Sequence, residues 1–293
     1  MEDTGIRKVV ITAAGLGTRL LSATKEMPKE MLPLFSVARN SDLSLKPVLQ
    51  LIFEQLYEVG FREFCFVVGR GKRSIEDHFT PDYGYVELLR RRGKEGLAAE
   101  LEDFYNKVDS SVIAWVNQPE PRGFGDAVLR AEPFVDGEPF VVHAGDTYII
   151  SQGGSHIKRL LQVHEARKPS AVLTLREVPD LRKLYGCAEV DAQGSVMRVR
   201  RVVEKPERPP SNLAIMPLYV FEPEVFDALR KTGPGVGGEV QLTDAIQKLI
   251  DSQRPVEAIK LREDEVRLDV GTPETYWEAL AISYDYAKRG GQL

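Results

Sequence analysis

A glycine-rich turn directly behind an apolar segment constrains this chain more than any other stretch. Residues 7–14 read Arg-Lys-Val-Val-Ile-Thr-Ala-Ala, which predicts a buried β-strand, and the turn Gly15-Leu-Gly-Thr follows at once. Glycines let backbone N–H groups approach a phosphate closely, and Arg19, Lys25 and Lys29 add positive charge just beyond the turn. Open parallel sheets bind ligands at this end of a strand. We interpret the stretch as the triphosphate cradle of a nucleotide-using enzyme.

Two common glycine motifs fit this turn less well. The P-loop requires Gly-x-x-x-x-Gly-Lys-Ser/Thr, whereas Gly15 is followed by Gly17 and the chain has no Gly-Lys-Ser/Thr sequence. The dinucleotide fingerprint Gly-x-Gly-x-x-Gly matches at these two glycines, but Leu20 occupies its third position, where a bulky side chain opposes close helix–strand packing. A hydride-transfer enzyme is therefore a weak alternative.

Strand and helix signals alternate along the rest of the chain. The predicted strands lie near residues 64–68, 112–116, 140–147, 185–191, 196–204, 214–221, 256–261 and 266–269, with a further one at 171–177. The predicted helices lie near residues 47–59, 73–108, 125–132, 156–166, 223–231 and 274–289, with another beginning at 237. The polar residues 36–46 predict a surface loop. We expect one α/β unit with elaborations.

The composition excludes several classes of function. The chain has 293 residues and a net charge of −5, which argues against non-specific nucleic-acid binding. Cys65 and Cys187 lie far apart in apolar stretches, which predicts buried, reduced thiols without a disulfide or metal site. The N-terminus is acidic, unlike a signal peptide, and no apolar run approaches the roughly 18 residues of a membrane span. We therefore expect a cytoplasmic protein without a membrane partner.

Further motifs follow the glycine turn in a fixed order. They are Pro28-Lys-Glu-Met-Leu-Pro, Gln118-Pro-Glu-Pro-Arg-Gly-Phe-Gly-Asp-Ala, Gly145-Asp, Tyr185-Gly, Glu204-Lys-Pro, Gly237-Gly-Glu-Val-Gln-Leu-Thr-Asp and Asp269-Val-Gly. With Ala14-Gly-Leu-Gly-Thr-Arg, this set closely resembles the sugar-1-phosphate nucleotidyltransferases, and most of all the bacterial and archaeal UTP–glucose-1-phosphate uridylyltransferases. The resemblance covers nearly the whole chain.

The resemblance implies a fold and a reaction. It implies a Rossmann-like, three-layer α/β/α fold with a mixed, mostly parallel central sheet and small β elaborations. The single domain would span 1–293, with residues 1–150 mainly binding nucleotide and 151–293 mainly binding sugar phosphate and ending in a helix. The implied reaction joins UTP and α-D-glucose 1-phosphate with Mg²⁺ and releases UDP-glucose and pyrophosphate. A homodimer or homotetramer is expected.

The resemblance also assigns roles to individual residues. The catalytic cations would be Arg19 and Lys29. The residues implied to bind nucleotide are Ala14, Gly15, Gly17, Thr18, Gln118 and Gly123, the last two at the pyrimidine edge. The residues implied to bind the sugar phosphate are Gly186, Glu204, Lys205 and Glu239. Asp146 and Asp269 would hold Mg²⁺.

Two motifs depart from the family pattern. The family usually reads Gly-Asp-Asp where this chain has Gly145-Asp-Thr147, and Gly-Leu-Gly-His-Ala where it has Gly123-Phe-Gly-Asp126-Ala. Because the second turn lies near the base, the choice between UTP and dTTP stays open. The alternatives are a dTTP-using thymidylyltransferase, a UDP-N-acetylglucosamine pyrophosphorylase and, from another class, a catalytically inactive nucleotide-sensing subunit.

Overall fold

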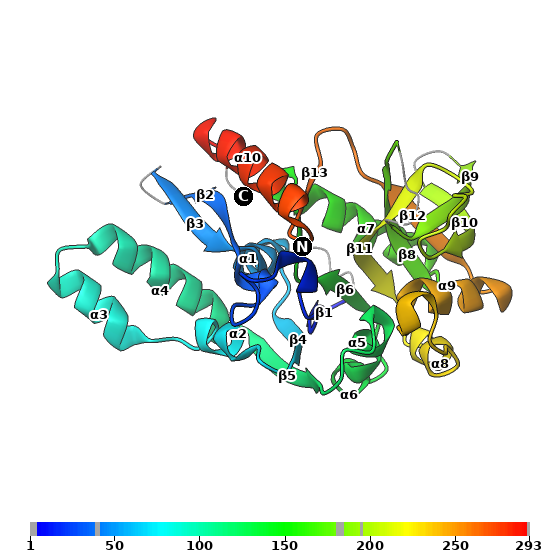
Figure 1. Cartoon of the computed structure of the whole chain (residues 1–293), viewed down its shortest axis with the longest axis horizontal. Coiled ribbons are helices and arrows are strands. Elements are labelled where there is room, and N and C mark those ends of the chain that lie inside the picture. Colours follow the sequence, from blue (N-terminus) through cyan, green and yellow to red (C-terminus); the bar gives the residue numbers. More distant parts are fainter. Residues whose placement is uncertain (1–4, 39–41, 180–184, 194–195, 292–293) are drawn as a thin grey trace.

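A nine-stranded sheet forms the centre of the computed structural model, which describes residues 5–38, 42–179, 185–193 and 196–291 (Figure 1). The strand order is β5-β4-β1-β6-β11-β8-β12-β10-β9. The strands are β1 (Lys8–Ala13), β4 (Glu63–Gly69), β5 (Val112–Gln118), β6 (Phe140–Ala144), β8 (Ala171–Glu177), β9 (Cys187–Gln193), β10 (Val196–Val203), β11 (Leu213–Phe221) and β12 (Val256–Lys260). Each of them overlaps a strand predicted from the sequence.

The sheet is mixed, as expected, but its two halves differ. In one half β5, β4, β1 and β6 all run parallel. In the other half β8 and β12 are parallel, whereas β11 is antiparallel to β6 and β8, and β10 is antiparallel to β12 and β9. The expectation of a mostly parallel sheet is therefore wrong for the second half. The connection between β9 and β10 is too short for a crossover and can join only antiparallel neighbours.

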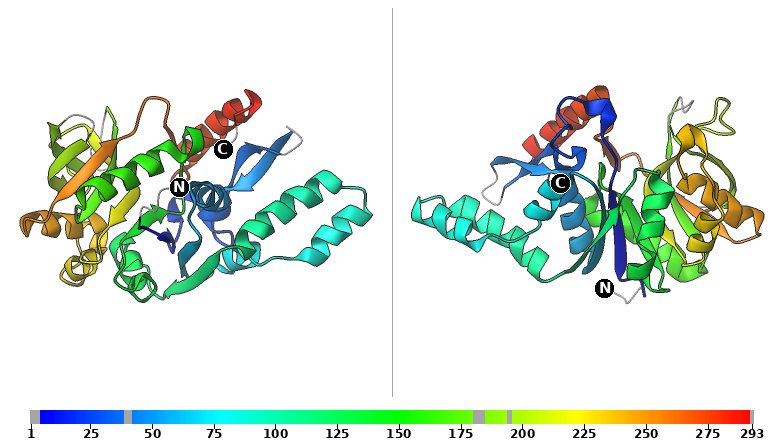
Figure 2. Two further views of the ribbon diagram at one scale, coloured as in Figure 1. Left: turned by 180° about the vertical axis from the view of Figure 1, so that it is seen from behind. Right: turned by 60° about the horizontal axis from the view of Figure 1, so that its bottom comes forward.

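Apolar side chains leave the sheet on both faces and build two hydrophobic clusters. In β1, Val9 and Ile11 belong to one cluster and Val10 to the other, because successive strand residues point to opposite faces. Helices contribute to both clusters and lie on both sides of the sheet in Figure 2. The first cluster includes residues of α1 (Val48–Val59), α4 (Glu95–Asp109) and α7 (Ser155–Arg167). The second includes residues of α5 (Phe124–Arg130), α6 (Glu132–Val135), α8 (Val225–Arg230) and α9 (Leu242–Asp251).

The charged segment 73–108 is helical, as predicted. It forms α2 (Arg73–His78), α3 (Tyr83–Arg91) and α4, and the last two make a pair that extends away from the sheet (Figures 1 and 2). No helix in the described ranges is both long and apolar enough to cross a membrane.

A β-hairpin replaces most of the loop predicted at 36–46. The prediction is wrong for residues 36–37 and 43–46, which lie in strands, and residues 39–41 lie outside the described ranges. β2 (Pro33–Val37) pairs with β3 (Leu43–Pro47) in antiparallel register. The helix α10 (Pro273–Lys288) covers β2, where the backbone N–H of Phe35 donates to Ser283 Oγ at 3.2 Å. Hairpin pairing and this packing stabilise strands in a segment whose polar residues resemble a loop.

Candidate active site

One cavity of about 830 Å³ opens where β1, β5 and β6 end. All fourteen residues to which the resemblance assigns a role line this cavity. They come from both halves of the chain, and the continuous sheet brings them together. Two short strands also contribute residues to the cavity. They are β7 (Thr147–Ile150), which follows β6 in the chain, and β13 (Val266–Asp269), and they pair antiparallel.

The glycine turn leaves β1 at Ala13 and takes a left-handed conformation at Gly17, where φ is 66°. Thr24 Oγ1 donates a hydrogen bond of 2.8 Å to the Gly17 carbonyl and holds the turn in place. A Cβ added at Gly15 would lie 3.7 Å from Lys29 Cε, so the turn and this side chain are neighbours. Arg19 lies exposed at the rim and forms no ion pair with any described residue.

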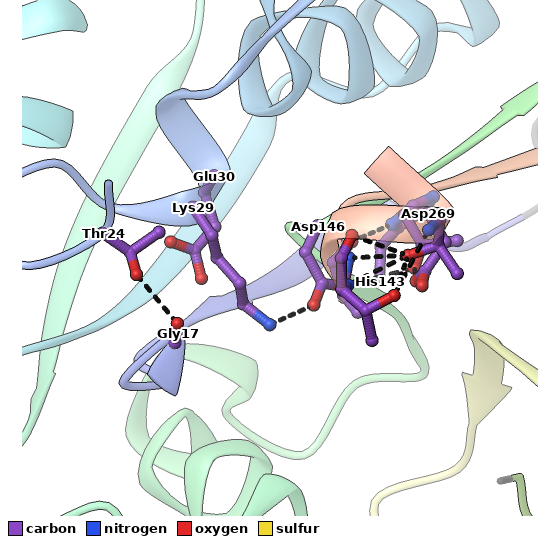
Figure 3. Close-up of polar contacts among 12 residues, drawn as sticks. Gly17, Thr24, Lys29, Glu30, His143, Asp146 and Asp269 are labelled. Atoms are coloured by element: carbon purple, nitrogen blue, oxygen red, sulfur yellow. Dashed lines mark hydrogen bonds and ion pairs between the residues drawn. The ribbon is translucent and has the colours of Figure 1, made fainter. Parts of the chain in front are cut away.

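Lys29 and Asp146 form an ion pair inside the cavity (Figure 3). Burial alone would lower the pKa of Lys29, but the carboxylates of Asp146 and Glu30 outweigh it and raise that pKa above its ordinary value. Burial likewise opposes ionisation of Asp146, yet the adjacent Lys29 ammonium holds the pKa of Asp146 below its usual range. Both groups are therefore charged at neutral pH.

Asp146 and Asp269 lie close together because Thr147 and Asp269 are register partners in the β7–β13 pair. Thr147 Oγ1 lies 3.3 Å from a carboxylate oxygen of each aspartate. Arg267 Nη2 donates to Asp269 Oδ1 at 2.6 Å. Sequence reasoning missed Arg267, although its i, i+2 spacing from Asp269 on a strand places both side chains on one face.

The donor set fits a magnesium ion that is bound together with a phosphate. Within the described ranges, no group of three or more His, Cys, Asp or Glu side chains could hold a metal. Mg²⁺ commonly binds to one or two carboxylates and completes its octahedron with substrate phosphates and water. Asp146 and Asp269 can supply those two carboxylates. They do not form a closed protein cage.

The residues that the resemblance assigns to the sugar phosphate also line the cavity. Lys205 Nζ lies 3.3 Å from Glu204 Oε1, and the other oxygen of Glu204 accepts a 2.7 Å hydrogen bond from Thr243 Oγ1. A Cβ at Gly186 would lie 3.1 Å from Glu204 Oε2 and 3.0 Å from Thr243 Oγ1, so a larger residue here would press on this carboxylate. Thr243 was not predicted. It fixes the Glu204 carboxylate and leaves the Lys205 ammonium accessible.

The turn after β5 packs tightly against the segment before α9. A Cβ at Gly123, where φ is +110°, would lie 2.7 Å from Glu239 Cβ. The Gly125 N–H donates to the Val240 carbonyl at 2.9 Å, and the Val240 N–H donates to the Arg122 carbonyl at 2.7 Å. Base-side and sugar-side residues therefore share one wall of the cavity.

A buried ion pair between Glu30 and Lys72 lies next to Lys29. Sequence reasoning missed it. Lys72 Nζ lies 2.8 Å from Glu30 Oε2, and both side chains are almost fully buried. Burial raises the pKa of Glu30 although the Lys72 charge opposes that rise. Because the partners are 42 positions apart, no local pattern reveals the pair.

Comparison with known proteins identifies the family of this chain. Residues 8–285 match the family model described as "Nucleotidyl transferase". The chain belongs to the nucleotidyl transferase family. Within that family, it is 36% identical to the UTP–glucose-1-phosphate uridylyltransferase of Pseudomonas aeruginosa over 291 residues, which cover 98% of this chain and 99% of the relative. It is 40% identical to the Bacillus subtilis enzyme of the same name over 253 residues, 85% of this chain and 82% of the relative.

Solved structures of family members agree with this placement. A UDP-glucose pyrophosphorylase complexed with UDP-glucose matches with a TM-score of 0.81 and 31% identity, over 97% of this chain and 99% of that chain. The UTP-bound UGPase of Acinetobacter baumannii matches with a TM-score of 0.81 and 29% identity, over 96% and 94%. The family predicted from the ordered motifs is confirmed.

Proposed function

We propose that this protein transfers a uridylyl group from UTP to α-D-glucose 1-phosphate, giving UDP-glucose and pyrophosphate. The observation that carries the proposal is the single cavity lined by all fourteen predicted residues. The names of the relatives support the same reaction.

The reaction needs alignment and charge neutralisation more than proton transfer. A phosphate oxygen of glucose 1-phosphate attacks the α-phosphorus of UTP, and the bond from that phosphorus to the β-bridging oxygen breaks in line. The electron pair leaves with pyrophosphate. Because the nucleophile is already anionic, no general base is required. Arg19 and Lys29 would stabilise the negative charge of the triphosphate and of the leaving pyrophosphate.

The remaining assignments divide between the nucleotide and the sugar phosphate. The turn residues Ala14, Gly15, Gly17 and Thr18 would hold ribose and phosphates, while Gln118 and Gly123 read the base. Lys205 would bind the sugar phosphate. The sugar hydroxyls would contact Gly186, Glu204 and Glu239.

Asp146 and Asp269 would hold Mg²⁺ together with substrate phosphate oxygens. Bound there, the ion would neutralise phosphate charge and polarise the reacting phosphoryl group. Lys29 keeps the Asp146 carboxylate ionised between turnovers. Arg267 holds the Asp269 carboxylate in place through its ion pair. Thr147, which replaces the second aspartate of the usual family motif, contacts both carboxylates.

We also propose a single Rossmann-like, three-layer domain that forms a homodimer or homotetramer. Helices on both faces and the hydrogen-bonded β6–β11 junction between the two halves support the single three-layer domain.

Exposed apolar side chains at α10 and the hairpin support the proposed homodimer or homotetramer: Trp277 is 69% exposed, Leu45 57% and Leu43 46%. A cytoplasmic location stays a prediction from the sequence.

A pyrophosphate-release assay tests the function. The purified protein is assayed with Mg²⁺ across a matrix of UTP, dTTP, CTP and ATP against glucose 1-phosphate and N-acetylglucosamine 1-phosphate. We expect the highest kcat/KM with UTP and glucose 1-phosphate. Turnover with no pair would reject the enzyme and favour the nucleotide-sensing subunit. A preference for dTTP or for the N-acetylated sugar would reject the assigned substrate.

A further inference from the structure

We propose that Asp126 is a positioning residue that selects the nucleotide base by holding the Gln118 amide in one orientation. The inference rests on the proposed function, in which Gln118 reads the pyrimidine edge. Asp126 lies outside the cavity lining and would act only through Gln118.

Both side chains are buried, Gln118 in the cavity wall and Asp126 behind it. Gln118 ends β5 and is 4% exposed, and Asp126 lies in the first turn of α5 and is 6% exposed. Gln118 Nε2 donates to Asp126 Oδ2 at 2.7 Å and to the Gly123 carbonyl at 3.1 Å. These two bonds use both N–H groups of the amide.

The chemistry of the two acceptors permits only one orientation of the amide. An ionised carboxylate and a backbone carbonyl accept hydrogen bonds and cannot donate them. A flipped amide would place Gln118 Oε1 against two oxygens and leave both interactions repulsive. Arg130 Nη2, 3.3 Å from Asp126 Oδ1, holds the carboxylate from its other side. Gln118 Oε1 accepts no hydrogen bond from any described residue, and Gln118 lines the cavity.

An acceptor held in this way discriminates between pyrimidines. Uracil and thymine carry a donor at N3–H, which can bond to Oε1, whereas cytosine carries an unprotonated N3 acceptor. Two opposed acceptors repel each other and leave both groups unpaired. Asp126 therefore favours UTP and dTTP over CTP. It does not separate UTP from dTTP, because their N3 groups are identical.

The test compares kcat/KM for UTP, dTTP and CTP in wild type, Asp126→Leu and Asp126→Asn, with glucose 1-phosphate and Mg²⁺. Leucine has similar size and no acceptor, so the amide can rotate. We expect the UTP-to-CTP ratio to fall about tenfold or more, mainly through KM, with UTP and dTTP affected alike. Asparagine keeps one acceptor oxygen, so its ratio should lie between those of wild type and the leucine variant. Arg130→Gln leaves both acceptors of Gln118 in place and should change the ratio by no more than about twofold.

Two further measurements separate this inference from the proposed function. Dissociation constants for UTP and CTP without sugar phosphate give the ratio independently of turnover, and thermal unfolding verifies that each variant is folded. An equal loss for UTP and CTP in both Asp126 variants would show a merely structural role and overturn the inference. A ratio unchanged from wild type would overturn it as well. Wild-type protein that binds UTP more tightly than CTP but turns over no substrate pair would reject the proposed reaction. A lower UTP-to-CTP binding ratio in Asp126→Leu would still support the role of Asp126.

Discussion

At the scale of single residues, the site holds the Lys29–Asp146 ion pair where the negatively charged triphosphate is proposed to bind. The Lys29 ammonium lies between the glycine turn and Asp146, so it faces a carboxylate before substrate binds. A buried charge without a partner is strongly destabilising, and the pair removes that penalty while keeping the ammonium at the reacting position. We expect Lys29 to share its hydrogen bonds between Asp146 and substrate phosphate during turnover.

Removal of the Lys29 ammonium should reduce turnover. Lys29→Ala deletes a preorganised cation, and we expect kcat to fall by roughly 10²-fold or more. The matched control is Lys231→Ala, which removes an exposed lysine outside the cavity and should leave kcat unchanged. Steady-state kinetics with saturating substrates measure both variants. A wild-type kcat in Lys29→Ala would exclude this residue from catalysis.

Asp146 should determine how much magnesium the enzyme needs. Asp146→Asn replaces an anionic oxygen ligand by a neutral amide, so we expect the Mg²⁺ concentration for half-maximal activity to rise about tenfold or more. Chelation with EDTA should abolish turnover of the wild type. Asp251→Asn, at the exposed end of α9, serves as the control. Superimposable metal titrations of wild type and Asp146→Asn would refute the proposed ligand.

At the scale of elements, the turn that opens α5 is locked to the segment that precedes α9. Two backbone hydrogen bonds and two glycines without space for a Cβ make this contact. The contact joins the base-reading wall to Glu239, which is assigned to the sugar. A change at the turn should therefore affect stability and both substrates together.

Gly125→Ala tests this contact. Its Cβ would lie 2.8 Å from the Val240 carbonyl oxygen and 3.1 Å from Gln241 C, so the backbone must shift. We expect the free energy of unfolding to fall by about 1–3 kcal/mol, with higher KM for both substrates. Gly96→Ala, in α4 with no atom within 4 Å of the new Cβ, should be neutral or stabilising by about 0.5–1 kcal/mol. Urea unfolding compares the two, and equal stabilities would contradict the packing argument.

At the scale of the whole molecule, the four histidines share one property. Burial is the largest cause of a lowered pKa at His78, His143, His156 and His164. The shift is largest at His156, whose pKa falls to about 3, and at His143, whose pKa falls to about 4. The folded protein thus keeps these rings neutral at pH values where the unfolded chain protonates them.

Stability should therefore decrease with acidification below the ordinary histidine pKa of about 6.5. In that range the unfolded state binds more protons, so the free energy of unfolding falls by up to about 1.4 kcal/mol per pH unit for each such histidine. Stability is fully present above pH 6.5 and is lost as pH falls toward the folded-state pKa values. His156→Asn should flatten the profile between pH 5 and 7, measured by urea unfolding. A variant slope equal to that of wild type would contradict the assignment.

Self-association should depend on the apolar surface of α10 and the hairpin. Leu45→Glu combined with Trp277→Glu places two charges on exposed apolar positions and should lower the molar mass measured by light scattering at fixed concentration. Leu97→Glu, on an equally exposed leucine of α4, should leave the mass unchanged. A double variant with the wild-type mass would place the interface elsewhere.

The sequence by itself determined the family and the residues around the cavity. Each motif is local: a strand followed by Gly15-Leu-Gly, the Gln118 turn and Glu204-Lys205 carry their information in adjacent residues. Such motifs follow strand ends, and a parallel sheet brings strand ends to one edge. The resemblance that these motifs carry assigned fourteen residues scattered over the chain, and all of them line one cavity.

Only the tertiary structure decided which of these groups touch. Lys29 and Asp146 are 117 positions apart, and Thr147 and Asp269 are 122 positions apart. The second contact depends on the register in which β7 pairs with β13. The Glu30–Lys72 ion pair and the antiparallel half of the sheet were missed because they too join residues far apart in the sequence. Strand register and the packing of distant segments minimise exposed apolar surface and unpaired polar groups over the whole molecule, and no local pattern encodes that balance.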